Sequence, residues 1–392
     1  MRFNLWEDCN RVPLTELLSF IVDNRGKTVP TAPSGHKLIA TNCVTNNTLF
    51  PVYDKIRYLS EETYQTWFRA HPIPGDILFV NKGTPGRVCL VPDPVDFCIA
   101  QDMIALRADE SKIYPKYLFT VLRSREIQQQ IYNTNVGDVI PHFKKQFLDQ
   151  LLIPIPERSI QESIGDLYYV LSLKAERNKK INDNLADLLQ TIYQERFGND
   201  ILAVNQGVLS DICSYSTDKV AVSELNVRTY FSTENMLSGK AGSTEATSLP
   251  TTSQTTACHK GDTLISNIRP YFKKIVYCED KCGCSTDVLC FTPSQPCYSA
   301  YLFSTLYADK FFAFMVAGSK GTKMPRGDKQ QIMTYPVVLP SEEELAGFNT
   351  IASPLLEQIY SNRAENKRLS ILRDTLLPKL MSGEIDVSAI QL

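Results

Sequence analysis

Two long stretches of the chain carry apolar residues at alternating steps of three and four. The first stretch runs from Ile160 to Ile192, and the second runs from Leu345 to Leu380. This spacing is typical of a coiled-coil seam. Each apolar stripe is too narrow for its helix to be stable alone, so each predicted helix needs a partner, and the other stretch supplies one. We predict that the two helices pack antiparallel.

A polar pair interrupts each seam near its midpoint. Lys174 and Asn178 stand in the first seam, and Asn362 and Asn366 stand in the second. In an antiparallel pair the two midpoints meet, so we predict that these four residues share one polar layer that fixes the register. Two unrelated helices on separate cores would not explain the matched positions. Pro354 lies within the second stretch and predicts a kink or a helix restart near Ser353.

The chain also contains an internal repeat that is wider than the helices. Pro156 and Pro340 are 184 residues apart, and at an offset of 186 the run Gly75-Asp76-Ile77-Leu78 matches Gly261-Asp262-Thr263-Leu264. The chain is therefore predicted to be two copies of one unit, each a mixed domain followed by a long helix. The predicted fold class is α+β, with four segments: globular residues 1–154, spacer helix 155–198, globular residues 199–338, and a second spacer helix with a C-terminal tail, 339–392.

Local patterns predict the elements of each globular domain. The first domain is predicted to hold a helix at Leu14–Phe20, strands at Lys37–Ala40, Ile77–Val80, Arg87–Val91 and Met103–Leu106, a helix from Pro115 to Tyr132, and a final strand within Phe147–Pro156. The second is predicted to hold an element at Val208–Ile212, a Ser/Thr/Gly-rich loop at Ser238–Thr256, strands near Asp262–Ser266 and Lys273–Tyr277, and a helix at Tyr298–Met315. We expect a twisted β-sheet with a few helices in each domain.

Composition and charge narrow the class of protein. The chain has 392 residues, a net charge of −2 and a pI near 6.2, which argues against a protein that binds nucleic acid over its whole surface. A DNA contact would have to be a local basic face, or depend on a partner that supplies the rest of the phosphate neutralisation. The acidic start lacks the apolar core of a signal peptide, no apolar run reaches membrane-spanning length, and the 11 cysteines follow no disulfide framework. We therefore expect reduced thiols in a cytoplasmic protein with no membrane partner.

Motifs for catalysis are missing from the sequence. It contains no phosphate-binding glycine loop, no zinc-protease motif, no N-P-P-Y-like methyltransferase motif and no paired-carboxylate nuclease core. The four histidines stand far apart in sequence. Cys278, Cys282, Cys284 and Cys290 follow a spacing that is not standard for zinc, so both a zinc site and a set of core thiols stay open, with core thiols favoured. We predict no metal site and no catalytic residue in this chain.

Basic and polar residues recur beside the repeated motifs of both domains. Arg and Lys can read guanine or hold phosphate, Asn can read adenine, and Ser and Thr serve either purpose. For any single one of these residues, the alternative to DNA binding is a place in an ordinary solvated loop. The predicted DNA-binding residues are Asn81, Lys82, Thr84, Arg87, His142, Lys144 and Lys145 in the first domain, and Asn267, Arg269, Lys273, Lys274, Ser319, Lys320, Thr322, Lys323 and Arg326 in the second.

The predicted parts follow one another along the chain as domain, helix, domain and helix. The last helix ends in the run Leu376-Leu377-Pro378-Lys379-Leu380-Met381-Ser382-Gly383-Glu384-Ile385. This ending, the Gly-Asp-Ile-Leu run and the prolines at 156 and 340 resemble the specificity (S) subunit of type I restriction-modification systems over essentially the whole chain. Pro154-Ile155-Pro156-Glu157-Arg158 departs from the family's proline-plus-Gln signature, although Gln161 could stand in for that Gln.

The resemblance implies two target-recognition domains and two spacer helices that also dock modification (methyltransferase) subunits. It implies double-stranded DNA and a restriction (nuclease/translocase) subunit as further partners. S-adenosylmethionine, ATP and Mg are then expected in the partner subunits, with no cofactor in this chain.

Helix length supports a split DNA target. The 33 residues from Ile160 to Ile192 span about 50 Å at roughly 1.5 Å per residue, whereas B-DNA repeats every ~34 Å. The leading hypothesis is a non-catalytic subunit that recognises two different half-sites about one to one-and-a-half turns apart. The competing hypotheses are a stand-alone DNA methyltransferase or nuclease, and a coiled-coil scaffold that binds only protein.

Overall fold

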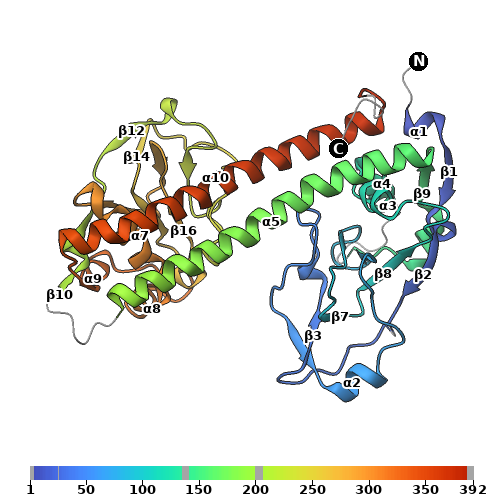
Figure 1. The fold of residues 1–392 in the computed structure, drawn as a ribbon, viewed down its shortest axis with the longest axis horizontal. Coiled ribbons are helices and arrows are strands. Elements are labelled where there is room, and N and C mark those ends of the chain that lie inside the picture. Colours follow the sequence, from blue (N-terminus) through green and yellow to red (C-terminus); the bar gives the residue numbers. More distant parts are fainter. Residues whose placement is uncertain (1–3, 25, 135–140, 199–205, 386–392) are drawn as a thin grey trace. The chain divides into compact units, whose positions relative to one another are not determined.

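Two packed units make up the chain in a computed structural model (Figure 1). The structure describes residues 4–24, 26–134, 141–198 and 206–385. Unit 1 comprises residues 1–179 and 364–392, and unit 2 comprises residues 180–363. Each unit therefore holds one globular part and one half of each long helix. The α+β fold class with two long helices is confirmed.

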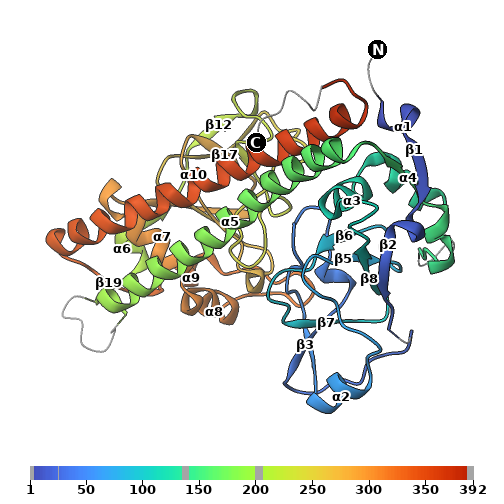
Figure 2. The same ribbon diagram turned by 45° about the vertical axis from the view of Figure 1, so that its right-hand side comes forward.

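The described residues of unit 1 form three sheets, with strand orders β1-β9, β2-β8-β5-β6 and β4-β3-β7. The four-stranded sheet carries the core, and α3 packs on it (Figure 2). The elements are α1 Leu5–Asp8, β1 Asn10–Pro13, η1 Leu14–Leu17, β2 Leu18–Val22, β3 His36–Ile39, η2 Thr41–Cys43, β4 Arg57–Leu59, α2 Glu61–Thr66, β5 Ile77–Val80, β6 Val88–Leu90, β7 Phe97–Ile99, β8 Met103–Ala108, α3 Pro115–Leu122, α4 Arg125–Asn133, η3 Lys145–Gln150 and β9 Leu152–Ile155.

Unit 2 repeats two of these sheets, since β10-β19 corresponds to β1-β9 and β11-β18-β15-β16 corresponds to β2-β8-β5-β6, whereas its third sheet has four strands in the order β12-β14-β17-β13. The two matching sheets support the predicted duplication. The elements are β10 Gln206–Val208, α6 Leu209–Ile212, β11 Cys213–Tyr215, β12 Lys219–Ala221, η4 Val222–Glu224, β13 Tyr230–Phe231, β14 Gln254–Cys258, β15 Thr263–Ser266, η5 Pro270–Phe272, β16 Ile275–Tyr277, β17 Cys282–Cys284, β18 Val288–Pro293, η6 Pro296–Tyr298, α7 Ser299–Tyr307, α8 Asp309–Ala317, α9 Lys329–Met333 and β19 Pro336–Val338.

The repeated Gly-Asp pair has the same structural role in both units. Gly75 and Gly261 adopt φ values of +86° and +94°, a left-handed backbone that glycine adopts without steric cost. The following aspartates are buried, and each accepts a backbone hydrogen bond: Asp76 Oδ2 from the Ile73 N–H at 3.0 Å, and Asp262 Oδ2 from the His259 N–H at 2.8 Å. The pair therefore forms the turn that leads into the central strand, β5 or β15.

Several predicted elements are corrected by the structure. Leu14–Phe20 is not a helix, because a 3-10 turn gives way to strand β2 at Leu18, which pairs with β8. The helix predicted to end at Tyr132 is two helices, since Ser124 caps α4 by accepting a hydrogen bond from the Ile127 N–H. The helix predicted at Tyr298–Met315 is likewise split, at Ala308. The strand predicted within Phe147–Pro156 is confined to β9, Leu152–Ile155, because residues 147–150 belong to the 3-10 turn η3. Strand β14 begins at Gln254, inside the predicted loop.

The two long helices are α5, Arg158–Phe197, and α10, Glu342–Met381. They run side by side in Figure 1, green and red. In unit 1, Ile164 and Leu171 of α5 line a small cavity with Arg373 and Leu380 of α10, which is an antiparallel arrangement. In unit 2, α5 and α10 are again antiparallel, as Asn182 contacts Asn362 while residues further along α5 pack near the start of α10.

Helix α10 passes through Pro354 without a break, so the predicted restart near Ser353 is wrong. The kink remains a prediction. Among the described residues, no helix is both long enough and apolar enough to span a membrane. The four-segment division at residues 154, 198 and 338 also remains a prediction, although α5 and α10 lie within the two segments predicted to be helical.

Candidate nucleic-acid interface

In unit 1 two predicted DNA-binding loops meet at the end of strand β5. Lys82 and His142 form a β-bridge, the Gly83 N–H donates to the Pro141 carbonyl at 2.9 Å, and the Phe143 N–H donates to the Asn81 carbonyl at 2.8 Å. These bonds hold the residues after β5 against the residues before η3. Backbone contacts, which tolerate many side chains, therefore place the predicted cations on one edge.

Unit 2 builds the same edge from the equivalent segments. Ile268 and Arg326 form a β-bridge, the Arg269 N–H donates to the Pro325 carbonyl at 2.8 Å, and the Gly327 N–H donates to the Asn267 carbonyl at 3.3 Å. A second bridge joins Lys320 to Arg326. Thus the loops predicted separately from sequence lie together in each unit.

The predicted residues differ in how much surface they offer to DNA. Asn81 and Asn267 are only 6% and 7% exposed, and their Oδ1 atoms have no hydrogen-bond partner in the structure. Side chains this buried are better placed to pack within the loops than to contact the edge of a DNA base. The exposed predicted residues are Lys82, Arg87, Lys144, Lys320, Thr322, Lys323 and Arg326, and the partly buried ones are Thr84, His142, Lys145, Arg269, Lys273, Lys274 and Ser319.

Acidic neighbours hold several of these cations in place. Lys145 pairs with Asp23, Lys320 with Asp328, and Arg326 Nη2 lies 3.0 Å from Asp287 Oδ1. Lys273 and Lys240 both contact Asp309 Oδ1, at 2.9 and 2.7 Å. The hydrogen bonds from Lys240 and Lys273 lower the pKa of Asp309. Partial burial lowers the pKa of Lys274, whose Nζ donates to the Thr233 carbonyl at 2.5 Å. These pairs orient the cations and leave their outer faces toward solvent.

The predicted polar layer of the helices consists of two asparagine pairs. In unit 1, Asn178 Nδ2 donates to Asn366 Oδ1 at 2.9 Å, and Lys174 Nζ lies 3.3 Å from Glu365 Oε2. In unit 2, Asn362 Nδ2 donates to Asn182 Oδ1 at 2.8 Å. The structure thus brings Asn178 and Asn366 together. Asn362 instead bonds to Asn182, a residue that lies next to the predicted seam position Ile181 and therefore was not predicted.

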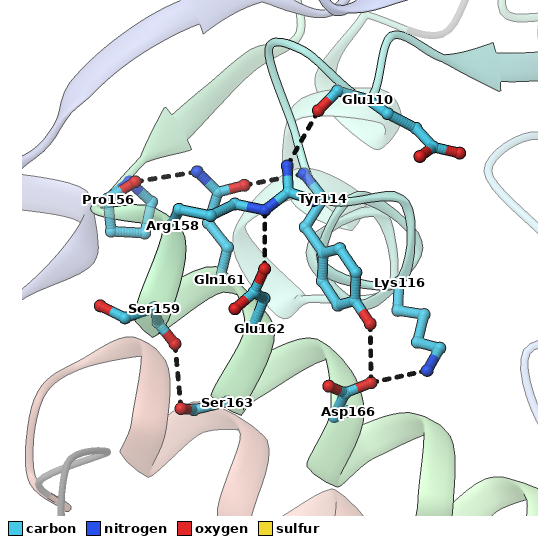
Figure 3. Close-up of polar contacts among 10 residues, drawn as sticks. All are labelled: Glu110, Tyr114, Lys116, Pro156, Arg158, Ser159, Gln161, Glu162, Ser163 and Asp166. Carbon is cyan, nitrogen blue, oxygen red and sulfur yellow. Dashed lines mark hydrogen bonds and ion pairs between the residues drawn. The ribbon is translucent and has the colours of Figure 1, made fainter.

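Gln161 fastens the start of α5 to unit 1 (Figure 3). Its side chain is 3% exposed, its Oε1 accepts from the Tyr114 N–H at 2.9 Å, and its Nε2 donates to the Pro156 carbonyl at 2.8 Å. One residue therefore joins the end of β9, the start of α3 and the first turn of α5. Asp166, one turn further, accepts from Tyr114 Oη at 2.8 Å and from Lys116 Nζ at 2.6 Å.

Replacing Gln161 with alanine is expected to destabilise unit 1 by about 2 kcal/mol, because a buried N–H and a buried carbonyl lose their partner. That loss corresponds to a decrease in Tm of roughly 5 °C for a unit of this size. Tryptophan fluorescence isolates the effect, since the two tryptophans of the chain, Trp6 and Trp67, both lie in unit 1. Ser163→Ala is the matched control, as Ser163 is a partly buried neighbour whose hydroxyl bonds only within the same helix, to the Ser159 carbonyl. Equal Tm values for the two variants would refute this role of Gln161.

Five cysteines of unit 2 share one hydrophobic core. Cys258, Cys278, Cys282, Cys284 and Cys290 are all buried, with Cys282 Sγ 3.5 Å from Cys278 Sγ. Hydrogen bonds from Cys258 and Cys278 lower the pKa of Cys282, whereas burial and its thiol neighbours raise that of Cys258. Over the described part of the chain, no three His, Cys, Asp or Glu side chains are grouped so that they could hold a metal ion. The five thiols pack among apolar side chains such as Met236, Leu264 and Val288.

Comparisons with known proteins agree with this architecture. Residues 19–196 match the family described as Type I restriction modification DNA specificity domain. The chain is 34% identical over 73 residues to the type I restriction enzyme MjaIX specificity subunit of Methanocaldococcus jannaschii, covering 19% of this chain. It is 24% identical over 153 residues to the HindI specificity subunit of Haemophilus influenzae, covering 38% of this chain. The matched stretches span only 17% and 33% of the lengths of these two relatives.

A solved structure extends the likeness to the whole fold. The crystal structure of a type I restriction-modification system S subunit from M. genitalium superimposes with a TM-score of 0.58 at 17% identity, covering 97% of this chain and 98% of that one. Residues 19–196 are thus similar to the type I restriction modification DNA specificity domain, and the chain shares its fold with the S subunit from M. genitalium.

Proposed function

We propose that this chain is the DNA-recognition subunit of a type I restriction-modification complex and that each unit reads one half of a bipartite DNA site. The observation that carries the proposal is the cationic edge built twice, from equivalent loops, in two units whose central four-stranded sheets have the same topology. The sequences of the two edges differ at most positions, so the two half-sites are expected to differ as well. Arg and Lys side chains on such loops supply the phosphate contacts that position a protein on DNA.

The partners in this proposal are modification (methyltransferase) subunits and a restriction subunit. Apolar side chains on α5 and α10 offer a surface for them: Val170, Ile371 and Leu372 of unit 1 are 48%, 49% and 46% exposed, unusually high for large aliphatic residues. S-adenosylmethionine, ATP and Mg would then act in the partner subunits. In this proposal the chain itself is non-catalytic and selects where the chemistry takes place.

A methylation assay tests the proposal. Modification subunits purified with this chain are expected to methylate adenines only at a split recognition sequence, and to lose that sequence-specific methylation when the chain is left out. Sequence-specific methylation without the chain would refute the proposal. The purified chain incubated alone with DNA, Mg²⁺ and S-adenosylmethionine is expected to show no turnover, and turnover there would favour the stand-alone methyltransferase or nuclease instead.

A further inference from the structure

The loop after β15 holds two charged residues in a strained backbone conformation. Arg269 and Lys273 have φ values of +51° each, in the left-handed region that side chains with a Cβ rarely adopt. The equivalent loop of unit 1 has glycines at its two left-handed positions, Gly83 and Gly86, where the conformation costs little. Strain of this kind persists only where the surrounding structure enforces it, and it concentrates at functional sites.

Between these two strained residues, the turn η5 presents a pair of aromatic rings to solvent. Tyr271 is 50% exposed and Phe272 is 38% exposed, and their ring centroids lie 4.8 Å apart. The equivalent turn in unit 1 carries Thr84 and Pro85, so it has no aromatic side chain. Both rings therefore keep a large part of their surface open to solvent although they lie next to each other on one turn.

Backbone hydrogen bonds from Gly239 and Lys240 hold this turn in place. The Gly239 N–H donates to the Phe272 carbonyl at 2.8 Å, and the Lys240 N–H donates to the Lys273 carbonyl at 2.9 Å. Lys240 and Lys273 also converge on Asp309 at the start of α8, against which η5 packs. Because the backbone is fixed on that side, the aromatic pair loses little conformational entropy when it binds a partner.

Basic side chains lie beside this turn, several of them paired with carboxylates. The Arg269 N–H bonds to the Pro325 carbonyl, which places the loop beside the segment that carries Lys320, Lys323 and Arg326. These three residues are exposed. A rigid aromatic tip flanked by cations matches the chemistry of duplex DNA, in which phosphates meet the cations and apolar rings can enter between base steps.

We propose that Tyr271 and Phe272 form an aromatic wedge that enters the DNA at the half-site of unit 2, partly unstacks one base step and bends the duplex there. Unit 1 has no equivalent wedge, so the two half-sites differ in DNA shape as well as in sequence. This inference rests on the proposed function, since it requires that unit 2 contacts DNA. Selectivity would follow, because flexible pyrimidine–purine steps are the easiest to unstack.

The wedge is tested in the complex of the full chain with its modification subunits on cognate duplexes. 2-Aminopurine is placed at successive positions of each half-site, apart from the methylated adenines, and end-labelled duplexes report bending by energy transfer. The wild-type complex is expected to raise 2-aminopurine fluorescence several-fold at one step in only one half-site. Tyr271→Ala/Phe272→Ala is expected to abolish that rise, reduce the bend and weaken cognate binding by about tenfold. Tyr271→Phe is expected to retain all three properties.

Ile73→Ala serves as the control, because Ile73 is an apolar residue 46% exposed that precedes β5, at the end of that strand opposite Asn81. Unchanged thermal unfolding of the double variant shows that any loss arises at the DNA. If the double variant keeps the fluorescence rise, the bend and the affinity, the wedge is overturned while the proposed function stands. If the wild-type complex shows no sequence-specific DNA binding, both the wedge and the proposed function are overturned.

Discussion

A chain lengthened by seven residues in α5 and seven in α10 is expected to recognise the same two half-sites with a gap about three base pairs longer. Seven helical residues add about 10.5 Å, which corresponds to about three steps of ~3.4 Å in B-DNA. A heptad preserves the 3/4 spacing of the seam, so the added segments can pair with each other. The half-sites are expected to persist because the reading loops stay untouched.

The structure indicates where the insertions belong. Helix α5 passes from unit 1 to unit 2 after Lys179, and α10 passes back after Arg363. Insertions at these two points leave the Asn178–Asn366 pair and the Asn182–Asn362 pair intact. Sequencing of methylated positions in a host carrying the variant measures both gap and half-sites. An insertion in α5 alone serves as control and is expected to destroy activity, because the asparagine pairs cannot both form. Altered half-sites with an unchanged gap would contradict the idea that the helices set the spacing.

Arg123→Ala is expected to lower the stability of unit 1 by about 3–5 kcal/mol, the range for breaking a buried charged network. Arg123 is 9% exposed, and its Nη2 donates to the carbonyls of Thr45, Thr48 and Val88 at 3.2, 2.5 and 2.8 Å. Its guanidinium carbon lies 4.4 Å from the Phe119 ring centroid. The substitution leaves three carbonyls without this donor and opens a cavity.

Urea unfolding followed by tryptophan fluorescence measures this loss. Arg125→Ala is the matched control, since Arg125 is an exposed arginine on the first turn of α4 and its removal is expected to cost less than about 0.5 kcal/mol. Arg123→Lys is expected to fall between the two, because one ammonium cannot reproduce the planar fork of the guanidinium. A midpoint for Arg123→Ala equal to that of Arg125→Ala would show that the buried network contributes little.

The pattern of apolar residues predicted α10 better than α5. Most predicted seam positions of α10 are buried or partly buried, from Leu345 to Leu380. In the second half of α5 the predicted Ile181 and Leu188 are 44% and 47% exposed, whereas Asn182 and Leu189 are buried. A straight α-helix with 3.6 residues per turn drifts from a strict 3.5-residue repeat. In the second half of α5, the aromatic cluster of Tyr193 and Phe197 with Tyr301 and Phe348 determines which face of the helix is buried.

The candidate interface was predicted in part because the repeat placed similar loops after similar strands. The sequence could not show which of these residues are buried within the loops, and Asn81 and Asn267 are. Tyr271 and Phe272 precede a strand and look like ordinary apolar sheet residues, so their exposure depends on the left-handed residues around them. Arg123 is similar, since its acceptors lie 35 to 78 residues away and only the tertiary structure brings them together.

Each globular part begins and ends on adjacent antiparallel strands. Asn10–Pro13 pairs with Leu152–Ile155, and Gln206–Val208 pairs with Pro336–Val338. The entry and exit of each part are therefore neighbours, so an entire reading module could be exchanged as a cassette through two adjacent splice points, with its interior untouched. If the proposed function holds, two such cassettes in one chain would allow recombination to generate new target combinations without any change in the partner enzymes that act on the DNA.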